Sequence, residues 1–580
     1  MKVKPALIAF LCTAVAFGQA NAQGFLKTEG KRIVNAKGEA VILRGMGLGG
    51  DMLQEGYMFH LSNLGQQYKI RAGIQNLIGA EKTARFYDKW LANNTRKIDI
   101  DSMAAWGFNS IRLPMHYALY TLPADEEPIA GKDTWLEKGF AQTDSLLKWC
   151  AANKIYLILD MHATPGGQGN DLAISDRNPD KPSLWQSDAN RQKMIALWKK
   201  LAERYVNEPY IGGYDIINEP NWGFEDPADK RGTTEKTNSP LKKLMMDVTA
   251  AIRRVDKNHI IIIEGNGFGN NYNGILPKWD DNMVLSFHKY GNFNNQGSIQ
   301  KFIDLRDQFN IPLWMGESGE NSNTWFTEAI GLVERNNIGW SWWPLKKMGI
   351  NNPLEIKEPA GYQKLLDHIS GKGSKLSATE AETILNQLLE NLKLENNVYH
   401  KDVTDAMFRQ VQSAAAKPFK SNNITANTTL NAVDYDLGRQ GVAYYDKDTA
   451  SYQYTPGVKT VGNRGHAYRN DGVDIEADAD GYYVFSIEDG EWLHYTLNIK
   501  KSGVYTIKLS VASPSANGRV SILAQGHQLG LTVPVPNTGG AQNWQTAEIK
   551  NVPLKAGVNK LRVLANTGGF NFKSIQFIME

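Results

Sequence analysis

Residues 211–220 read Ile-Gly-Gly-Tyr-Asp-Ile-Ile-Asn-Glu-Pro, an apolar, β-rich run that ends in a polar pair. Runs of this kind recur between residues 40 and 345, each followed by a longer helical or loop segment, at 41–48, 109–114, 155–162, 259–265, 283–290, 311–318 and 338–344. Runs that are apolar on both faces and alternate with helical patterns predict a parallel sheet covered by helices. Eight such units in about 300 residues favour an α/β fold, the closed (β/α)8 TIM barrel. A doubly wound open sheet is the structural alternative.

The chain changes character after the barrel. Ser370-Gly371-Lys372-Gly373-Ser374 is a flexible breaker, and helical patterns follow at 378–394 and 402–416. They predict a short helical connector, which either packs on the barrel or acts as a semi-rigid spacer. Beyond residue 422, short alternating runs separated by Gly, Asn and Pro predict an all-β sandwich of the jelly-roll type, most clearly at 504–512, 520–523, 547–552 and 559–564. The predicted domains are therefore a barrel at 23–370, a connector at 371–421 and a sandwich at 422–580.

The amino terminus has the pattern of an export signal. A basic start, an apolar run at 6–17 and Ala20-Asn21-Ala22 predict a secretory signal peptide at 1–22, with a buried helix as the alternative. We therefore expect a secreted or periplasmic monomer, without a membrane anchor once the signal is cleaved. Lys and Arg total 64 against 61 Asp and Glu, without basic blocks, which argues against nucleic acid or an anionic membrane as a partner.

The ends of the predicted strands carry polar and aromatic side chains, where the working residues of such barrels lie. Glu219 and Glu317 end the fourth and seventh strands, each after an apolar run. Cleavage of a glycosidic bond needs one carboxyl group to protonate the leaving oxygen and a second at the anomeric carbon. A structural salt bridge is the alternative for either residue alone. A metal-dependent hydrolase would require a His-x-His pair, whereas the third strand gives Asp160-x-His162, so we expect no metal and no cofactor.

These motifs together resemble glycoside hydrolase family 5 over roughly residues 30–350. The resemblance rests on Asn218-Glu219-Pro220, His288-x-Tyr290, Glu317, Ser110-Ile111-Arg112-Leu113-Pro114, Asp160-Met161-His162 and Gly339-Trp340-Ser341-Trp342-Trp343. It implies a retaining mechanism, in which Glu317 is the nucleophile and Glu219 is the general acid and then the base.

The expected roles of the other residues follow from their chemistry. Arg112 and Tyr290 should donate hydrogen bonds that keep the pKa of Glu317 low, whereas a drier setting should raise the pKa of Glu219. We expect Asn218 to hold the sugar 2-hydroxyl group. The remaining predicted contacts are sugar binding or orientation of the acid by His162 and His288, and a flat face for the sugar ring from Trp343.

The substrate is less sharply indicated. Arg44-Gly45-Met46-Gly47-Leu48-Gly49-Gly50 followed by Glu55 resembles family members that act on β-1,3-glucans, although those often carry Trp in place of Asp51. Glu55 is therefore a further candidate for substrate binding. We expect a retaining β-glycoside hydrolase that cleaves a β-glucan with β-1,4 or mixed β-1,3/1,4 linkages. The alternatives are an exo-acting β-1,3-glucanase, a mannan- or xylan-directed hydrolase, and a non-catalytic carbohydrate-capture protein with an inactive barrel.

The sandwich region resembles carbohydrate-binding module family 6 over about residues 429–577, through Asp434-Tyr435-Asp436, Asp471-Gly472-Val473-Asp474 and Gly568-Gly569-Phe570-Asn571. The resemblance implies a ligand cleft that contains Trp544 and Asn571, with Ser486 at the second aromatic position. The positions of the family's calcium ligands hold Asn431, Val433 and Lys573, and an apolar residue and a cation cannot serve as oxygen ligands for calcium. We therefore expect no calcium there, and either a weakened sugar binder or a structural partner of the barrel.

Overall fold

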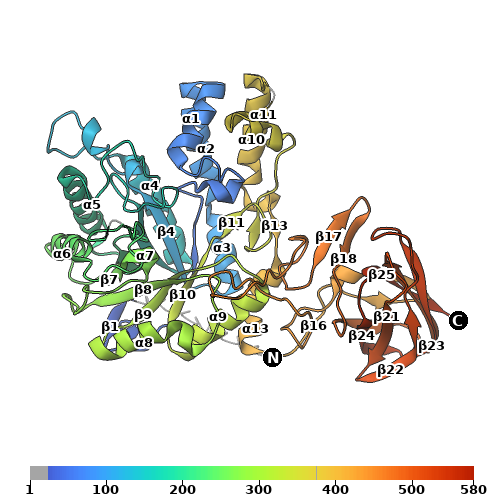
Figure 1. Cartoon of the computed structure of the whole chain (residues 1–580). Helices are drawn as coiled ribbons and strands as arrows, with labels where there is room; N and C mark the ends of the chain where they lie inside the picture. Colours follow the sequence, from blue (N-terminus) through green and yellow to red (C-terminus); the bar gives the residue numbers. More distant parts are fainter. Residues whose placement is uncertain (1–23, 227, 374) are drawn as a thin grey trace, which may run out of the picture.

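The computed structural model describes residues 24–226, 228–373 and 375–580, so the signal peptide expected at 1–22 lies outside the described residues. Figure 1 shows a barrel, an upright group of helices above it and a sandwich to one side. Among the described residues, no helix combines the length and the apolar character needed to cross a membrane.

Eight parallel strands form the barrel, in the order expected from the sequence, and β10 pairs back with β3 to close it. This closure confirms the predicted (β/α)8 fold and excludes the open sheet. The strands are β3 (Arg44–Gly47), β4 (Ser110–His116), β5 (Tyr156–Ala163), β6 (Ile211–Asp215), β7 (Ile261–Glu264), β8 (Met283–Lys289), β9 (Leu313–Gly319) and β10 (Gly339–Trp343). The helices between and after them are α3 (Lys97–Trp106), α4 (Glu137–Ala152), α5 (Asp188–Tyr205), α6 (Ser239–Arg253), α7 (Asn266–Gly269), α8 (Gln296–Phe309) and α9 (Asn323–Arg335).

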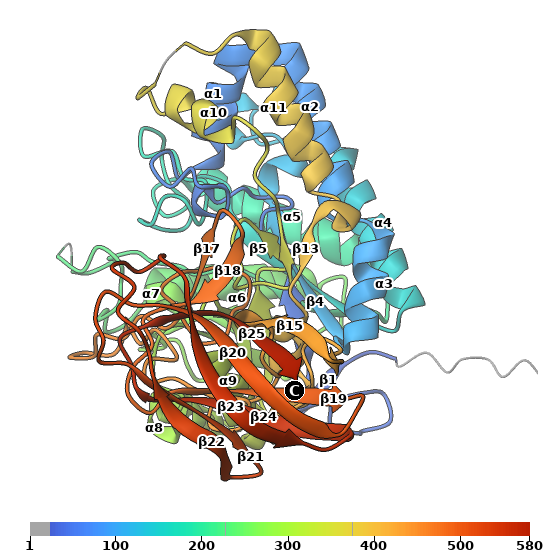
Figure 2. The same cartoon turned by 90° about the vertical axis from the view of Figure 1, so that its right-hand side faces the viewer.

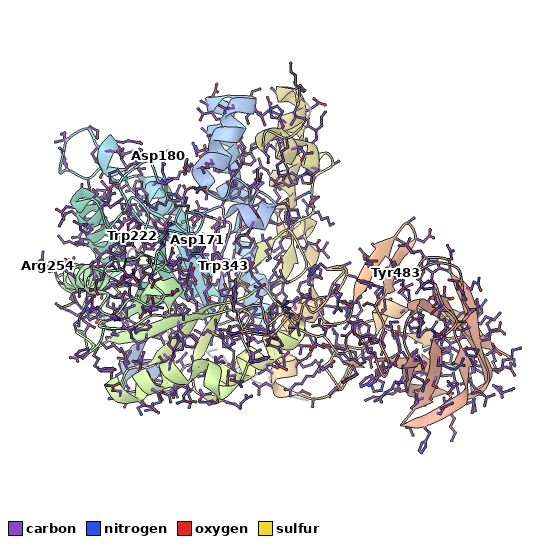
Figure 3. All side chains as sticks on the ribbon, in the orientation of Figure 1. Asp171, Asp180, Trp222, Arg254, Trp343 and Tyr483 are labelled. Atoms are coloured by element: carbon purple, nitrogen blue, oxygen red, sulfur yellow. The ribbon has the colours of Figure 1, made fainter. Side chains whose placement is uncertain are left out.

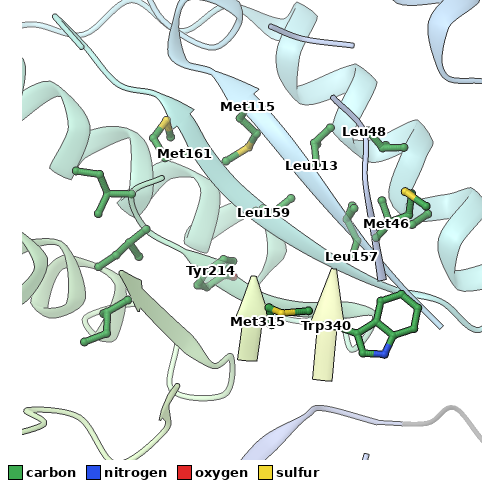
Figure 4. Packing of buried hydrophobic residues seen from close by; sticks show 14 of the residues in the cluster. Met46, Leu48, Leu113, Met115, Leu157, Leu159, Met161, Tyr214, Met315 and Trp340 are labelled. Atoms are coloured by element: carbon green, nitrogen blue, oxygen red, sulfur yellow. The ribbon is translucent and has the colours of Figure 1, made fainter. Parts of the chain in front are cut away.

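The alternation of side chains along a strand places the site at one end of the barrel. On β5, Leu157, Leu159 and Met161 belong to the core that packs against the helices (Figure 4). The alternate residues of β5 face the interior of the barrel. Tyr156 and Ile158, near the start of the strand, belong to an apolar cluster, whereas Asp160 and His162, near its end, are polar. The amino-terminal half of the barrel is therefore a dry core, which the hairpin of β1 (Lys27–Glu29) and β2 (Arg32–Val34) covers, and the carboxyl-terminal half is polar.

A group of helices stands beside the barrel mouth with a core of its own, and Figure 2 shows α1, α2 and α11 side by side. Its members are α1 (Gln67–Ile78), α2 (Ala80–Asn94), α10 (Tyr362–Ile369) and α11 (Ala378–Asn391). Ile70, Ile74 and Trp90 pack there with Leu385 and Leu388. The helix expected at 378–394 is thus packed and does not act as a spacer.

The chain then returns to the barrel. Strand β13 (Val398–Tyr399) pairs with β12 (Leu354–Glu355), which also pairs with β11 (Lys346–Lys347). The helix expected at 402–416 is divided into α12 (Lys401–Met407) and α13 (Arg409–Gln412), and both pack on α9.

Two sheets form the carboxyl-terminal sandwich, which confirms its predicted all-β class. One contains β14 (Asn423–Ile424), β16 (Tyr444–Tyr445), β19 (Trp492–Ile499), β21 (Arg519–Ala524), β22 (His527–Pro534) and β24 (Gly557–Thr567). The other contains β15 (Asn427–Asn431), β17 (Ile475–Asp478), β18 (Gly481–Val484), β20 (Gly503–Ala512), β23 (Gln545–Leu554) and β25 (Asn571–Met579). Alternate residues of both sheets, such as Ile507, Leu509 and Leu561, fill the core between them.

The sandwich contacts the barrel directly at the amino end of α9. Asn323 N donates to Asn470 O at 2.8 Å, and Asn470 Nδ2 donates to Asn321 O at 2.8 Å. The hydroxyl groups of Thr324 and Tyr444 lie 2.7 Å apart. These bonds are buried, so the two domains are packed on one another and not merely tethered.

Candidate active site

A cavity of about 610 Å³ opens at the carboxyl ends of the barrel strands. Its walls include seven of the residues expected from the sequence: Glu55, His162, Glu219, His288, Tyr290, Glu317 and Trp343. Arg112 and Asn218, the two other expected barrel residues, are fully buried and hydrogen-bonded to this set. The structure therefore brings all nine together.

Arg112 is the charged centre on which the site is built. From β4, its guanidinium donates to Glu317 Oε2 at 2.8 Å, to Asn218 Oδ1 at 2.8 Å and to Asp215 Oδ2 at 2.9 Å. Glu264 Oε1 and Asp160 Oδ2 lie 3.1 and 3.2 Å from Nη2. Burial opposes the charge of Arg112, but the surrounding carboxylates raise its pKa well above the ordinary value. Arg112 thus remains a buried cation that fixes several acids at once.

Glu317, on β9, is held through both of its oxygens. Arg112 donates to Oε2, and the Tyr290 hydroxyl donates to Oε1 at 2.8 Å. The side chain is almost fully buried but still lines the cavity. This is the expected geometry of a carboxylate that is oriented from behind and open to a substrate in front.

Glu219 follows β6 in a left-handed backbone conformation, with φ of +40°. Such a conformation costs a non-glycine residue about 1–3 kcal/mol and is found mainly where the surroundings fix it. Here the Glu219 N–H donates to Glu264 Oε2 at 2.7 Å. Burial raises the pKa of Glu219, against the lowering effect of His288. A carboxyl group that keeps its proton more readily is suited to act as a general acid.

His288 connects the two ends of this network. Its Nδ1 lies 2.7 Å from Glu219 Oε1, and its Nε2 lies 3.1 Å from Glu264 Oε1. Burial lowers the pKa of His288, but the nearby Glu264 and Glu317 carboxylates raise it well above the ordinary value. A protonated imidazole donates from both nitrogens, so His288 orients the side chain of Glu219.

Glu219, His288 and Glu317 each place one oxygen or nitrogen atom within 4.8 Å of the other two, which is close enough for the three atoms to bind a metal ion. The chemistry of these groups argues for proton transfer. Both ring nitrogens of His288 already have carboxylate partners in Glu219 and Glu264, and the Arg112 guanidinium lies 2.8 Å from Glu317. The absence of a metal stays a prediction.

Trp343 gives one side of the cavity an aromatic surface. Trp343 stacks on His162 at a ring-centroid distance of 5.1 Å and donates its indole N–H to the Tyr57 hydroxyl at 3.0 Å. A Cβ atom at Gly47 would lie 2.5 Å from the indole ring, so the glycine-rich first strand provides the space for Trp343. Glu55 Oε1 lies 3.6 Å from His162 Nε2, and burial raises the pKa of Glu55 to about 7.

Some residues of the site were missed by the sequence analysis. Asp215 is a lone acid between Tyr214 and Ile216, and this interruption of an apolar strand was the available signal. Tyr57 and Phe268 line the cavity from loops without a recognisable motif. Tyr454 comes from the sandwich, and nothing in its local sequence indicates a place near the barrel.

The expected cleft of the sandwich is differently arranged. Trp544 donates its indole N–H to Asp478 Oδ2 at 3.2 Å, and Lys573 Nζ lies 5.1 Å from the centroid of a Trp544 ring. The same ammonium group is 2.7 Å from Asp478 Oδ2. Asn571 donates to Ala541 O at 2.7 Å. The residues expected to bind sugar are thus engaged with their neighbours. Figure 3 shows Tyr483, whose ring contacts that of Trp544, on the sandwich and far from Trp343.

A parallel barrel with two buried carboxyl groups, one held by a cation and one hydrogen-bonded to an imidazole, facing a cavity at its strand ends, is the arrangement of a glycoside hydrolase. Comparison with known families agrees. Residues 67–349 match the model of "Cellulase (glycosyl hydrolase family 5)", and residues 466–579 match "Carbohydrate binding module (family 6)". The barrel belongs to glycosyl hydrolase family 5 and the sandwich to carbohydrate-binding module family 6, as the two resemblances implied.

Two curated relatives are named as enzymes that act on carbohydrates. A β-xylosidase of Phanerodontia chrysosporium is 27% identical over 61% of this chain and 77% of its own. Endoglucanase C of Acetivibrio thermocellus is 24% identical over 46% of this chain and 88% of its own. Among solved structures, the family 6 module of a marine laminarinase from Zobellia galactanivorans is 27% identical, with a TM-score of 0.20, and covers 26% of this chain and 98% of that one. The two curated relatives differ in their named activities, so the family alone does not define the polysaccharide.

Proposed function

We propose that this glycoside hydrolase retains the anomeric configuration and cleaves a β-glucan by double displacement. The observation that carries the proposal is the spacing of the two acids, because an oxygen of Glu219 and an oxygen of Glu317 lie within 4.8 Å of one another. Retaining enzymes place their carboxyl groups about 5–5.5 Å apart, whereas inverting enzymes need about 6.5–9.5 Å to admit a water molecule between acid and sugar.

In the first step, the Glu317 carboxylate attacks the anomeric carbon and forms a glycosyl ester, while the bond to the leaving oxygen breaks. Glu219 gives its proton to that oxygen. In the second step, the Glu219 carboxylate takes a proton from water, the water oxygen attacks the anomeric carbon, and Glu317 is released. Each residue is thus returned to its starting state.

The surrounding contacts support these roles. Arg112 and Tyr290 hold both oxygens of Glu317, so that one orientation is fixed before substrate arrives. His288 aims Glu219, whose raised pKa favours the protonated form that the first step needs. Arg112 also fixes Asn218 Oδ1 at 2.8 Å, and we assign the Asn218 amide to the 2-hydroxyl group of the sugar.

For the substrate, we propose a β-glucan with β-1,4 or mixed β-1,3/1,4 linkages. The endoglucanase relatives and the match to the cellulase model support this assignment. Two alternatives rest on other relatives: exo action on β-1,3-glucan, from a glucan 1,3-β-glucosidase of Blumeria graminis, and xylan, from the β-xylosidase. We further propose that the protein is exported, on the strength of the pattern at residues 1–22, and that it has no nucleic-acid or anionic-membrane partner, on the strength of the near-neutral charge balance.

Product analysis on a panel of polysaccharides tests the proposal. The purified protein is incubated with barley β-glucan, carboxymethylcellulose, laminarin, mannan and xylan, and the products are followed by chromatography and by NMR of the anomeric proton. Short β-configured oligosaccharides from barley β-glucan or carboxymethylcellulose support the proposal. Glucose alone from laminarin would favour the exo alternative, α-configured first products would overturn retention, and no release from any polymer would overturn the β-glucan assignment.

A further inference from the structure

One wall of the catalytic cavity comes from the sandwich domain. Gln453 and Tyr454 line the cavity together with Glu219 and Glu317. The Tyr454 N–H donates to Gly291 O at 3.0 Å, and Gly291 directly follows Tyr290, which donates to Glu317. The second domain therefore reaches the backbone next to a residue that orients the proposed nucleophile.

The segment that carries these two residues, 449–454, is fixed on the barrel. Ser322 Oγ donates to Thr449 O at 2.5 Å, and Asn321 exchanges two hydrogen bonds with the backbone of Ser451, at 2.7 and 3.1 Å. Between them, Ala450 is buried within the barrel core. Tyr452 adds a ring contact with Phe293 at 4.7 Å. Tyr454 is thus presented on a docked segment and not on a free loop.

The Tyr454 side chain has the properties of a stacking surface for sugar. It is 62% exposed and at the same time forms part of the cavity wall. The ring comes so close to the barrel backbone that a Cβ atom at Gly291 would lie 2.8 Å from Tyr454 Cδ2. A flat, rigid ring can pack against the C–H face of a pyranose, while its hydroxyl group remains in water. The adjacent Gln453 amide offers both a donor and an acceptor for sugar hydroxyl groups.

We propose that Tyr454 and Gln453 form a distal sugar subsite of the catalytic cleft, so that the sandwich domain completes the substrate-binding site of the barrel. The ligand is a β-linked sugar unit of the same polysaccharide chain, beyond the units held at Glu219 and Glu317. This inference rests on the proposed function. It gives the sandwich a role in selecting long chains at the active site itself, separate from any binding at its own expected cleft.

The test compares long and short substrates in the full-length chain. For Tyr454→Ala, kcat/KM is measured on cellohexaose and on an aryl β-cellobioside, or on the laminari-oligosaccharide equivalents if product analysis selects β-1,3 linkages. Because a lost stacking contact removes binding of the distal unit only, we expect about a tenfold loss on the hexaose and a loss of less than twofold on the aryl glycoside. Tyr454→Phe, which keeps the ring, should recover most of the activity on the hexaose.

Tyr482→Ala is the matched control, because Tyr482 is an exposed tyrosine of the same domain that does not line the cavity. It should leave both substrates unaffected, and thermal melting should show that all variants are folded. Equal losses on the long and the short substrate, or no loss on either, would overturn the inference while leaving the proposed function intact. Failure of the wild-type protein to cleave any polysaccharide would overturn both.

Discussion

The barrel mouth and the expected cleft of the sandwich contain the same kinds of residues, acids, a cation and an indole, but in opposite arrangements. In the barrel, Arg112 lies behind Glu317 and leaves the carboxylate facing a cavity of about 610 Å³. In the sandwich, Lys573 lies against Trp544 and pairs with the acid that the indole also contacts. A binding site therefore needs more than the right residues. The binding groups must be oriented by neighbours on the side away from the cavity, and their cavity side must remain free for the ligand.

The largest loss of activity should follow removal of the two barrel carboxyl groups. We expect Glu317→Ala and Glu219→Ala each to lower turnover by roughly 10³-fold or more, because one removes the nucleophile and the other the proton donor. Initial rates on the polysaccharide chosen by product analysis provide the measurement. Glu81→Gln, at an exposed position of α2, should have no effect. Near-normal turnover in either active-site variant would mean that these acids are not the catalytic pair.

Removal of the cation behind the acids tests the same arrangement through stability. Arg112→Met leaves Asp160, Asp215, Glu264 and Glu317 without their buried partner. We expect the free energy of unfolding to fall by about 3–5 kcal/mol, since an unpaired buried charge is costly. Denaturant titration followed by circular dichroism measures the change.

The control for this variant is Arg85→Met, whose side chain is half exposed in α2 and forms only a surface ion pair. It should change the unfolding free energy by less than about 0.5 kcal/mol. A loss at Arg112 as small as that at Arg85 would show that the acids adjust without the cation, contrary to its central place in the network.

The imidazole of His288 should affect the pH dependence of the activity. His288 lowers the pKa of Glu219, so removal of its charge in His288→Asn should let Glu219 keep its proton to higher pH. Activity that needs protonated Glu219 is lost as pH rises through this pKa, so the alkaline limb of the rate profile should move to higher pH. Rates measured from pH 4 to 10 test this, with His527→Asn in the sandwich as a control. A shift to lower pH would reverse the assigned role.

How far the sequence could predict this molecule depends on the range of the contacts involved. The strands were found because burial on both faces leaves a continuous apolar run, and the site followed because residues at strand ends must converge in a barrel. In the apolar run at 211–220, however, the strand ends at Asp215. Ile216 and Ile217 are buried but lie beyond the strand, and Glu219 has a left-handed backbone conformation. An apolar run in the sequence therefore indicates which residues are buried, but it does not show where the hydrogen-bonded strand ends.

Contacts between distant elements left no such pattern. The helix at 378–391 was visible in the sequence, but its packing against α1 and α2 was not, because an apolar face does not identify its partner. The same holds for Tyr454, whose position depends on the docking of the sandwich through Asn321 and Ser322. The fold and the convergence of the buried polar residues at the strand ends were predictable from periodicity and motif, whereas the outer wall of the cleft was not.

The smallest expected effect lies in the sandwich, at Trp544. Because its indole N–H already bonds to Asp478 and Lys573 lies over the ring, Trp544→Ala should change retention of the protein in glucan-containing gels by less than twofold. The measurement is made in a Glu317→Gln background to prevent hydrolysis of the gel. Lys573→Ala should increase retention by uncovering the ring, and the double variant should lose that increase. A loss of fivefold or more from Trp544→Ala alone would show that the ring binds sugar despite the ammonium group, and the two regions would then differ in strength and not in kind.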